Sequence, residues 1–179
     1  MKLYTRKGDA GQTDLLGERV SKSDPRIGVL GALDEATSAI GLARAHTESA
    51  RIGRMLIDCQ HDLYQIMAEL AFTDDIRPAQ YVLRPERVAW LEEETDLLGS
   101  EITLAPAFVL PGETIAAATT DVARTVVRRA EREAVILHEG HPTVNRQILR
   151  YLNRLSSLLF IVARYLESLD DSGPRPARR

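Results

Sequence analysis

Four arginines stand close together between residues 108 and 132, in the segment FVLPGETIAAATTDVARTVVRRAER. Residues four apart share a face of an α-helix, so a helix here would align Arg124, Arg128 and Arg132 as a ladder of guanidinium groups, with Arg129 beside it. Like charges at this spacing repel one another unless acidic groups or a polyanion compensate them. The segment therefore predicts either a binding site for a polyanion or a solvated face that nearby glutamates neutralise.

The first 24 residues combine glycines, hydroxyl side chains and basic side chains, and they do not look helical. Gly8 and Gly11 favour turns that expose backbone N–H groups, and Thr13 and Lys22 add further donors. Small residues let such donors approach phosphate oxygens, so this segment could cradle a phosphate. The P-loop pattern G-x-x-x-x-G-K-[ST] does not occur in it. A flexible arm is the alternative interpretation.

The composition limits the kind of partner that the chain can take. Its 179 residues predict one domain, and a net charge of −3 argues against a general nucleic-acid or membrane surface. The single cysteine, Cys59, excludes an intrachain disulfide and lies in an apolar helical pattern, which predicts a core residue. The N-terminus lacks the apolar core of a signal peptide, and no apolar run is long enough to span a bilayer. We therefore expect a cytoplasmic protein without nucleic-acid or membrane partners.

Apolar periodicity and capping signals predict the elements that position these groups. Asp24 followed by Pro25 is typical of a helix start, and Gly140 of a helix end. Apolar side chains recur every three or four positions in residues 50–72 and again in residues 144–169, which indicates two buried stripes. No convincing strand pattern occurs, and residues 171–179 are predicted to be disordered. The sequence therefore predicts an all-α bundle of five helices, at about residues 25–47, 50–72, 84–98, from the Pro111-Gly112 turn to 139, and 144–169.

Three separated segments carry a resemblance to a known family. They are YTRKGDAGQTDLLGERVSKSDPR with the following LDEATSAIG, then FVLPG through ARTVVRRAER, and finally YLNRLSSLLFIVAR. Together they make the chain resemble the PduO-type ATP:cob(I)alamin adenosyltransferases from about residue 3 to residue 166. The ARTVVRRAER and LNRLS segments are the most specific of these signals.

This resemblance implies a five-helix bundle that assembles as a homotrimer with active sites between subunits. It implies a single domain over residues 1–170, in which residues 1–24 form an irregular ATP-binding segment and residues 25–170 the helical bundle. ATP would lie between the N-terminal segment of one subunit and the arginine-rich helix of its neighbour. Matched position by position, the implied ATP contacts are Thr5, Arg6, Lys7, Gly8, Thr13, Lys22, Arg128, Arg129, Glu131, Arg132 and Asn153.

The resemblance also implies the catalytic residues and the cofactors. Asp34 would pair with Arg124, Arg128 would bind the triphosphate, and Phe108 would cover the lower face of the corrin. The cofactors would be ATP and Mg²⁺, with the metal held mainly by the phosphates, and cobalamin would be the substrate. A reductase that delivers cob(I)alamin and an enzyme that accepts adenosylcobalamin would be further partners.

The implied mechanism is a positioning task, because cob(I)alamin is itself a strong nucleophile. The protein would align C5′ of ATP with cobalt and stabilise the charge that develops on the departing triphosphate. Excluding a lower axial ligand would make cob(II)alamin four-coordinate and easier to reduce.

Three departures from the family pattern lie near the expected corrin pocket. Glu113 stands where a second glycine is usual, Thr120-Asp121 replaces a Leu-His pair, and Ser157 replaces an aspartate. Loss of that last carboxylate could weaken the orientation of Arg154 or Arg128. Two alternatives therefore stay open: a non-catalytic carrier or sensor that binds ATP or adenosylcobalamin, and a purely structural helical oligomer.

Overall fold

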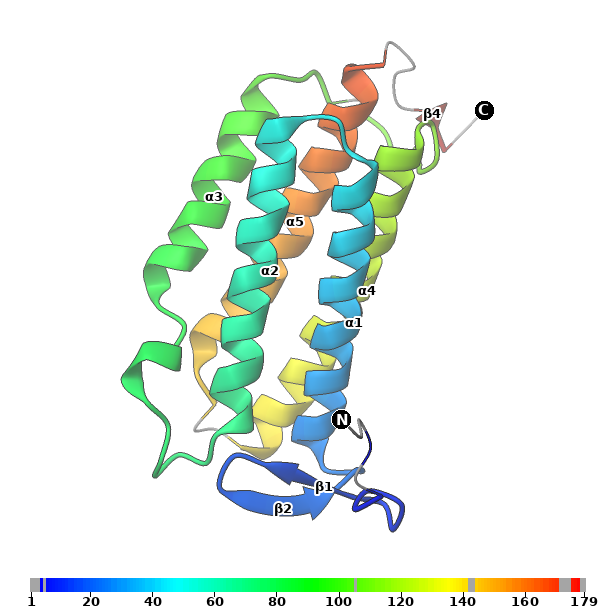
Figure 1. Ribbon diagram of the computed structural model, residues 1–179. Helices are drawn as coiled ribbons and strands as arrows, with labels where there is room; N and C mark the ends of the chain where they lie inside the picture. Colours follow the sequence, from blue (N-terminus) through cyan, green and yellow to red (C-terminus); the bar gives the residue numbers. More distant parts are fainter. Residues whose placement is uncertain (1–3, 5, 105, 142–143, 171–174, 178–179) are drawn as a thin grey trace.

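The computed structural model describes residues 4, 6–104, 106–141, 144–170 and 175–177, and its main body is a bundle of five α-helices (Figure 1). α1 packs on α2 and α4, and α5 packs on α4 and α3. The predicted five-helix bundle is thereby confirmed, with boundaries that agree to within a few residues. The helices are α1 Pro25–His46, α2 Ala50–Ala71, α3 Pro85–Ser100, α4 Ile115–Gly140 and α5 Arg146–Ser168, with a short 3₁₀ turn at Ala79–Tyr81.

Side chains just ahead of the helices explain where they begin. The Asp24 carboxylate accepts from the backbone N–H of Arg26 at 2.9 Å, with Pro25 at the first helical position. α4 begins after Thr114, whose hydroxyl accepts from the N–H of Ala117 at 3.1 Å. Each cap satisfies a backbone donor that the first helical turn leaves without a partner. The arginine-rich helix is therefore fixed at its start, directly after the segment that contains Phe108.

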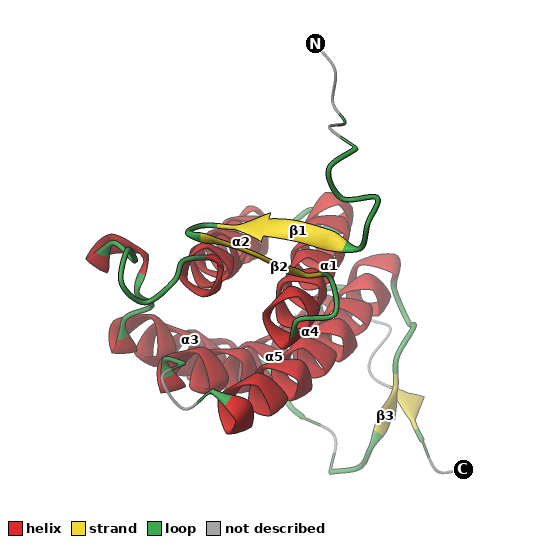
Figure 2. Ribbon diagram, turned by 90° about the horizontal axis from the view of Figure 1, so that it is seen from below, coloured by secondary structure: helices red, strands yellow, loops and turns green. Residues whose placement is uncertain are grey.

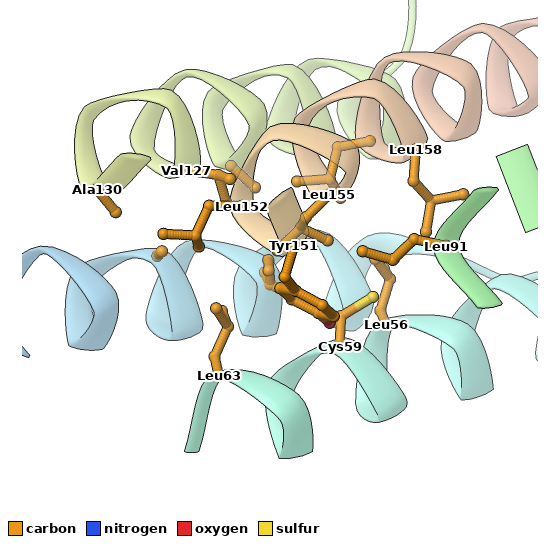
Figure 3. Packing of buried hydrophobic residues seen from close by; sticks show 14 of the residues in the cluster. Leu56, Cys59, Leu63, Leu91, Val127, Ala130, Tyr151, Leu152, Leu155 and Leu158 are labelled. Atoms are coloured by element: carbon orange, nitrogen blue, oxygen red, sulfur yellow. The ribbon is translucent and has the colours of Figure 1, made fainter. Parts of the chain in front are cut away.

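The core lies between the helices and is closed by apolar stripes of α2 and α5. Figure 3 shows Tyr151 of α5 pointing between Cys59 and Leu63 of α2, and all three are fully buried. The Tyr151 hydroxyl donates to Asp62 at 2.7 Å, and Arg87 of α3 donates to the same carboxylate at 2.7 Å. This shared carboxylate ties α2, α3 and α5 together. Cys59 is a buried core residue, as its place in the apolar pattern predicts.

The expectation that the chain contains no strands is wrong for the N-terminal segment. β1 (Gln12–Leu15) and β2 (Glu18–Ser21) form an antiparallel hairpin across the ends of α1 and α2 (Figure 2). At the turn, Gly17 has φ +110°, and a Cβ there would lie 2.5 Å from Thr73 Oγ1. Leu16 donates to Ala71 O at 2.9 Å, so the turn is held against the end of α2. The strands are short and largely exposed, so they carry little of the apolar alternation by which a strand is recognised.

A second pair of strands joins the C-terminal tail to the segment before α4. β3 (Val109–Leu110) pairs antiparallel with β4 (Arg175–Pro176), and the Ala177 N–H donates to the Phe108 carbonyl at 2.7 Å. The Arg175 guanidinium also contacts Glu113, with Nε 2.9 Å from Oε1. The predicted disorder of residues 171–179 therefore does not hold for residues 175–177, and the rest of that tail lies outside the described residues. Within the described part of the chain, no helix has the length and apolar character to cross a membrane.

Candidate functional site

The arginine ladder lies along α4, and its members differ in their partners. Arg129 pairs with Glu35 of α1, and Arg124 pairs with Asp121 one turn earlier. The exposed Arg128 and Arg132 form no ion pair with any described residue; Arg132 donates to the Arg128 carbonyl at 3.1 Å. Two adjacent guanidinium groups therefore face solvent without a carboxylate.

The neighbouring glutamates do not neutralise these two arginines. Glu131 accepts instead from the Asn153 amide of α5 at 2.9 Å. Glu133 forms no ion pair among the described residues. Its carboxylate lies beside Gly28 of α1, 3.9 Å from where a Cβ on that glycine would stand. Of the two interpretations of the ladder, the geometry favours the polyanion site over the neutralised solvated face.

The expected pairing of Asp34 with Arg124 does not form within the chain. Arg124 Nε donates to Asp121 Oδ1 at 2.8 Å, while Asp34 is exposed on α1 and has no ion pair or hydrogen bond within the described ranges. The physical reason is proximity, since Asp121 stands on the same face of α4 as Arg124, three residues earlier.

An apolar cavity of about 530 Å³ opens beside Phe108. Phe108 is 90% exposed at this cavity, which is unusual for so large an apolar side chain and indicates a surface that receives a ligand or partner. Arg124 and Phe160 line this cavity and also a second one of about 420 Å³, which Arg128 lines as well. The remaining residues around the first cavity are Pro106, Ala107, Val109, Pro111, Asp121 and Arg164.

The three departures from the family pattern take different places around these cavities. Ser157 lines the second cavity, and its hydroxyl lies 3.5 Å from the Asn153 carbonyl. Arg154 is held by Glu92, with Nε 2.7 Å from Oε1, so the serine does not leave this arginine without a carboxylate. Glu113 is engaged by the C-terminal tail, and Asp121 is buried beside Arg124.

The N-terminal segment forms a basic turn next to the hairpin. A Cβ built on Gly8 would lie 3.2 Å from Lys22 Nζ, and the Lys22 N–H donates to Gly11 O at 2.8 Å. Arg6 has φ +62°, a left-handed backbone that is costly for a residue with a side chain and is enriched at functional sites. Lys7 lies in the same turn, where its carbonyl accepts from Arg19 at 2.6 Å. Thr13 is half-buried in β1, and the predicted Thr5 lies outside the described residues.

The β1–β2 hairpin, which follows the basic turn, and the β3–β4 pair, which follows Phe108, lie at opposite ends of the bundle (Figure 1). α4, which runs between those ends, has 26 residues, so at 1.5 Å per residue it is about 39 Å long. The hairpin is bonded to the end of α2, and β3 is bonded to the C-terminal tail. The structure therefore gathers Arg124, Arg128 and Phe160 around adjoining cavities, but it does not bring the N-terminal residues to them within one chain.

A buried charge cluster beneath the Phe108 cavity was not predicted from the sequence. Arg164 is 5% exposed and donates to Asp121 Oδ2 at 2.6 Å and to Glu167 Oε1 at 2.8 Å. A second contact, 2.7 Å between Arg164 Nε and Glu167 Oε2, is an ion pair too bent for a hydrogen bond. Burial raises the pKa of Glu167. The available signal was an Arg-x-x-Glu pair inside the apolar stripe of α5, where charges need partners.

Comparison with known proteins gives consistent results over nearly the whole chain. A sequence model of the family described as Cobalamin adenosyltransferase matches residues 3–166. A corrinoid adenosyltransferase from Bacillus subtilis is 37% identical over 177 residues, covering 97% of this chain and 90% of that protein. The corrinoid adenosyltransferase PduO from Citrobacter freundii is 38% identical over 92% of this chain, which spans 49% of that longer protein. Among solved structures, a variant PduO-type ATP:corrinoid adenosyltransferase from Lactobacillus reuteri, complexed with cobalamin and ATP, superposes with a TM-score of 0.92 at 33% identity, covering 99% of this chain and 97% of that one.

Proposed function

This chain belongs to the cobalamin adenosyltransferase family, and we infer that it is an ATP:cob(I)alamin adenosyltransferase. It transfers the 5′-deoxyadenosyl group of ATP to the cobalt of cob(I)alamin and produces adenosylcobalamin and triphosphate. In the structure itself, the main support for this function is that two adjoining cavities have different linings. One cavity is lined by Arg124 and by Arg128, which has no carboxylate partner among the described residues, and this suits a triphosphate. The other is largely apolar around Phe108, which suits the face of a corrin.

The triphosphate site is proposed to combine Arg128 and Arg132 with the basic N-terminal turn. Charge-assisted hydrogen bonds from guanidinium groups to phosphate oxygens are among the strongest that proteins make. Thr5, Arg6, Lys7, Gly8, Thr13 and Lys22 are proposed to supply the remaining donors. Arg129, Glu131 and Asn153 are already engaged with other side chains, so we assign them the task of orienting this site.

Mg²⁺ is proposed to lie on the triphosphate oxygens. Within the described ranges no group of three or more His, Cys, Asp or Glu side chains could hold a metal ion. When bound there, Mg²⁺ would neutralise part of the charge that develops on the leaving group.

We propose that the chain works as a homotrimer whose sites are shared between copies. Within one chain the hairpin that follows the basic turn and the β3–β4 pair that follows Phe108 lie at opposite ends of the bundle, which supports a site that two copies complete (Figure 1). α4 also exposes Ile115, Val122 and Ile136, by 67%, 52% and 57% of their surfaces, at spacings that place them along one side of the helix. Asp34 and the terminal nitrogens of Arg124 would then meet between copies. Sedimentation velocity tests this assembly, and a monomer at the concentration that supports turnover would contradict it.

The chemistry requires alignment more than it requires a protein nucleophile. The cob(I)alamin cobalt attacks C5′ of ATP, the cobalt–carbon bond forms, and the bond from C5′ to the triphosphate oxygen breaks with its electron pair leaving on the triphosphate. Arg128 and Arg132 stabilise that charge, and fixed donors do so without reorganising during the reaction. Phe108 excludes water and a lower ligand from cobalt. A reductase must supply cob(I)alamin, an adenosylcobalamin-dependent enzyme must accept the product, and we place all of this in the cytoplasm.

The decisive experiment is a spectroscopic assay of the whole protein. Purified protein is mixed with ATP, Mg²⁺ and chemically reduced cobalamin without oxygen, and the conversion of the cob(I)alamin spectrum into that of adenosylcobalamin is followed. We expect conversion that depends on both ATP and protein. Tight binding of ATP or adenosylcobalamin without conversion would instead identify a carrier or sensor.

A further inference from the structure

Asp121 occupies an unusual position, as a buried carboxylate shared between two arginines. It is 3% exposed, Oδ1 accepts from Arg124 Nε at 2.8 Å, and Oδ2 accepts from Arg164 at 2.6 Å. Arg164 is in turn held by Glu167, which is fully buried. Four charges therefore form a chain in the order Glu167, Arg164, Asp121, Arg124, and only the last of them reaches partly to solvent.

This row of four linked charges is expected to contribute little to the stability of the fold. Each buried charge loses its hydration, and replacing a buried ion network with apolar side chains is often neutral or stabilising. The four linked charges do fix the orientation of their side chains, because each oxygen of Asp121 is bound to a different guanidinium group. With Oδ2 bound to Arg164, Oδ1 is left in one orientation, toward Arg124.

The orientation matters because Arg124 lies in the wall common to both cavities. Together with Phe160 it lines the cavity beside Phe108 and the cavity beside Arg128. Arg164 also stacks over the Phe160 ring, with its guanidinium carbon 5.2 Å from the ring centroid. Arg124 uses only Nε in its bond to Asp121, and its two terminal nitrogens make no hydrogen bond with any residue that the structure describes. Those nitrogens therefore remain for groups outside the chain.

We propose that Asp121 is a positioning residue of the transfer reaction, which holds the Arg124 guanidinium in the wall between the two cavities and leaves its terminal N–H groups to the contact with Asp34 that is proposed between copies. This proposal rests on the proposed adenosyltransferase activity. It gives Asp121 a role of its own, at a position where the family pattern has a histidine and where Arg124 was expected to depend on Asp34.

The test is a double-mutant cycle of Asp121→Asn and Arg124→Ala. Asparagine keeps the size of the side chain but presents an amide N–H₂ to one of the two guanidinium groups, so one arginine loses its acceptor. Loss of a charge-assisted hydrogen bond predicts that Asp121→Asn lowers kcat/KM for cob(I)alamin about tenfold. Because Asp121 acts through Arg124, the same change in the Arg124→Ala background should lower it by no more than about twofold.

A matched control separates positioning from mere structural support. Asp62 is also a buried carboxylate, 5% exposed and bonded to Arg87 and to Tyr151, but it lines neither cavity. Asp62→Asn should lower the melting temperature at least as much as Asp121→Asn while leaving kcat/KM unchanged. If the effects of Asp121→Asn and Arg124→Ala simply multiply, or if Asp62→Asn reproduces the kinetic loss, Asp121 is only a structural residue.

Binding measurements keep this test independent of turnover. Titration of the same proteins with cob(II)alamin in the presence of ATP gives a second cycle, in which the coupling of Asp121 and Arg124 appears in the dissociation constant. A wild-type protein that binds cob(II)alamin but does not turn over would contradict the proposed function, while the binding cycle would still measure the coupling of Asp121 and Arg124. An active wild type whose cycles show no coupling would contradict only the role of Asp121.

Discussion

Replacement of Phe108 by alanine separates the function of this residue from the stability of the fold. Phe108 is 90% exposed, so the folded chain gains little from its ring. If a phenylalanine side chain offers roughly 200 Å² of apolar surface, the buried tenth is about 20 Å², which corresponds to about 0.5 kcal/mol of folding free energy. We therefore expect the variant to keep its helical content and its oligomeric state, with a melting temperature within a few degrees of the wild type.

The expected loss of rate is much larger than this. A corrin face resting on the ring would cover roughly half of it, or about 100 Å², which corresponds to about 2.5 kcal/mol. If that contact is made mainly in the transition state, when the lower ligand must be absent, its loss lowers kcat by about 70-fold. ATP binding should change little, because Phe108 lines the first cavity and not the second, which Arg128 lines.

The assay is the anaerobic conversion of cob(I)alamin, with ATP affinity measured separately by calorimetry. Tyr64→Ala is the matched control, since Tyr64 is an aromatic residue of α2 that is 65% exposed and lines neither cavity. It should leave both the stability and the rate unchanged. A Phe108→Ala protein with wild-type kcat would contradict a corrin contact at this residue and show that the exposed ring serves another contact.

Three further predictions follow from other parts of the molecule. Arg128→Ala removes a guanidinium group that has no carboxylate partner among the described residues, so turnover should fall at least about a hundredfold while sedimentation still shows the wild-type assembly; normal turnover would show that the ladder is misassigned. Burial raises the pKa of Glu69 in the folded protein. The stabilisation that comes from this protonated carboxyl group is therefore full at pH values below the pKa of the unfolded state, and it is lost as pH rises through the pKa of the folded state. Urea unfolding at several pH values should therefore show that the free energy of unfolding of Glu69→Gln rises relative to that of the wild type as pH increases. A difference in unfolding free energy that does not change with pH would contradict this. Burial also raises the pKa of the Cys59 thiol, which should resist alkylation in the native protein and react after unfolding.

The helices could be predicted from the sequence because their signals are local. The apolar stripes of residues 50–72 and 144–169 recur with the period of a helix, and caps such as Asp24 mark the starts. The hairpin at Gln12–Ser21 could not be predicted in this way, because its short strands are stabilised by the end of α2, which is distant in sequence. The two-residue pairing of β3 with β4 depends on contact between residues more than sixty positions apart.

The partners of the charged side chains were harder to predict than the helices. Assigning Asp34 to Arg124 followed from the family resemblance, whereas in the chain itself Asp121 lies closer on the same helix. Sequence spacing identified which arginines share a face of α4, but it could not say which of them a carboxylate from α1 or α5 would reach. Only the packing of α4 against α1 and α5 decides that Glu35 reaches Arg129 and that Arg164 reaches Asp121.

Carboxylate partners are distributed unevenly among the arginines of α4, and this distribution bears on ligand binding. Where a guanidinium group is buried or touches another helix, the fold provides an acidic partner, as Asp121 does for Arg124 and Glu35 does for Arg129. Like charges four residues apart destabilise a helix by about 0.2–0.5 kcal/mol, so Arg128 and Arg132 work against the stability of the free chain. Within the described ranges neither has a carboxylate, although Glu131 lies between them and is drawn away to Asn153. Because the fold neutralises Arg124 and Arg129 and leaves Arg128 and Arg132 unpaired, we propose that the charge of these two serves an anion that arrives from outside. The cavity that Arg128 lines would place that anion next to Arg124 and the ring of Phe160.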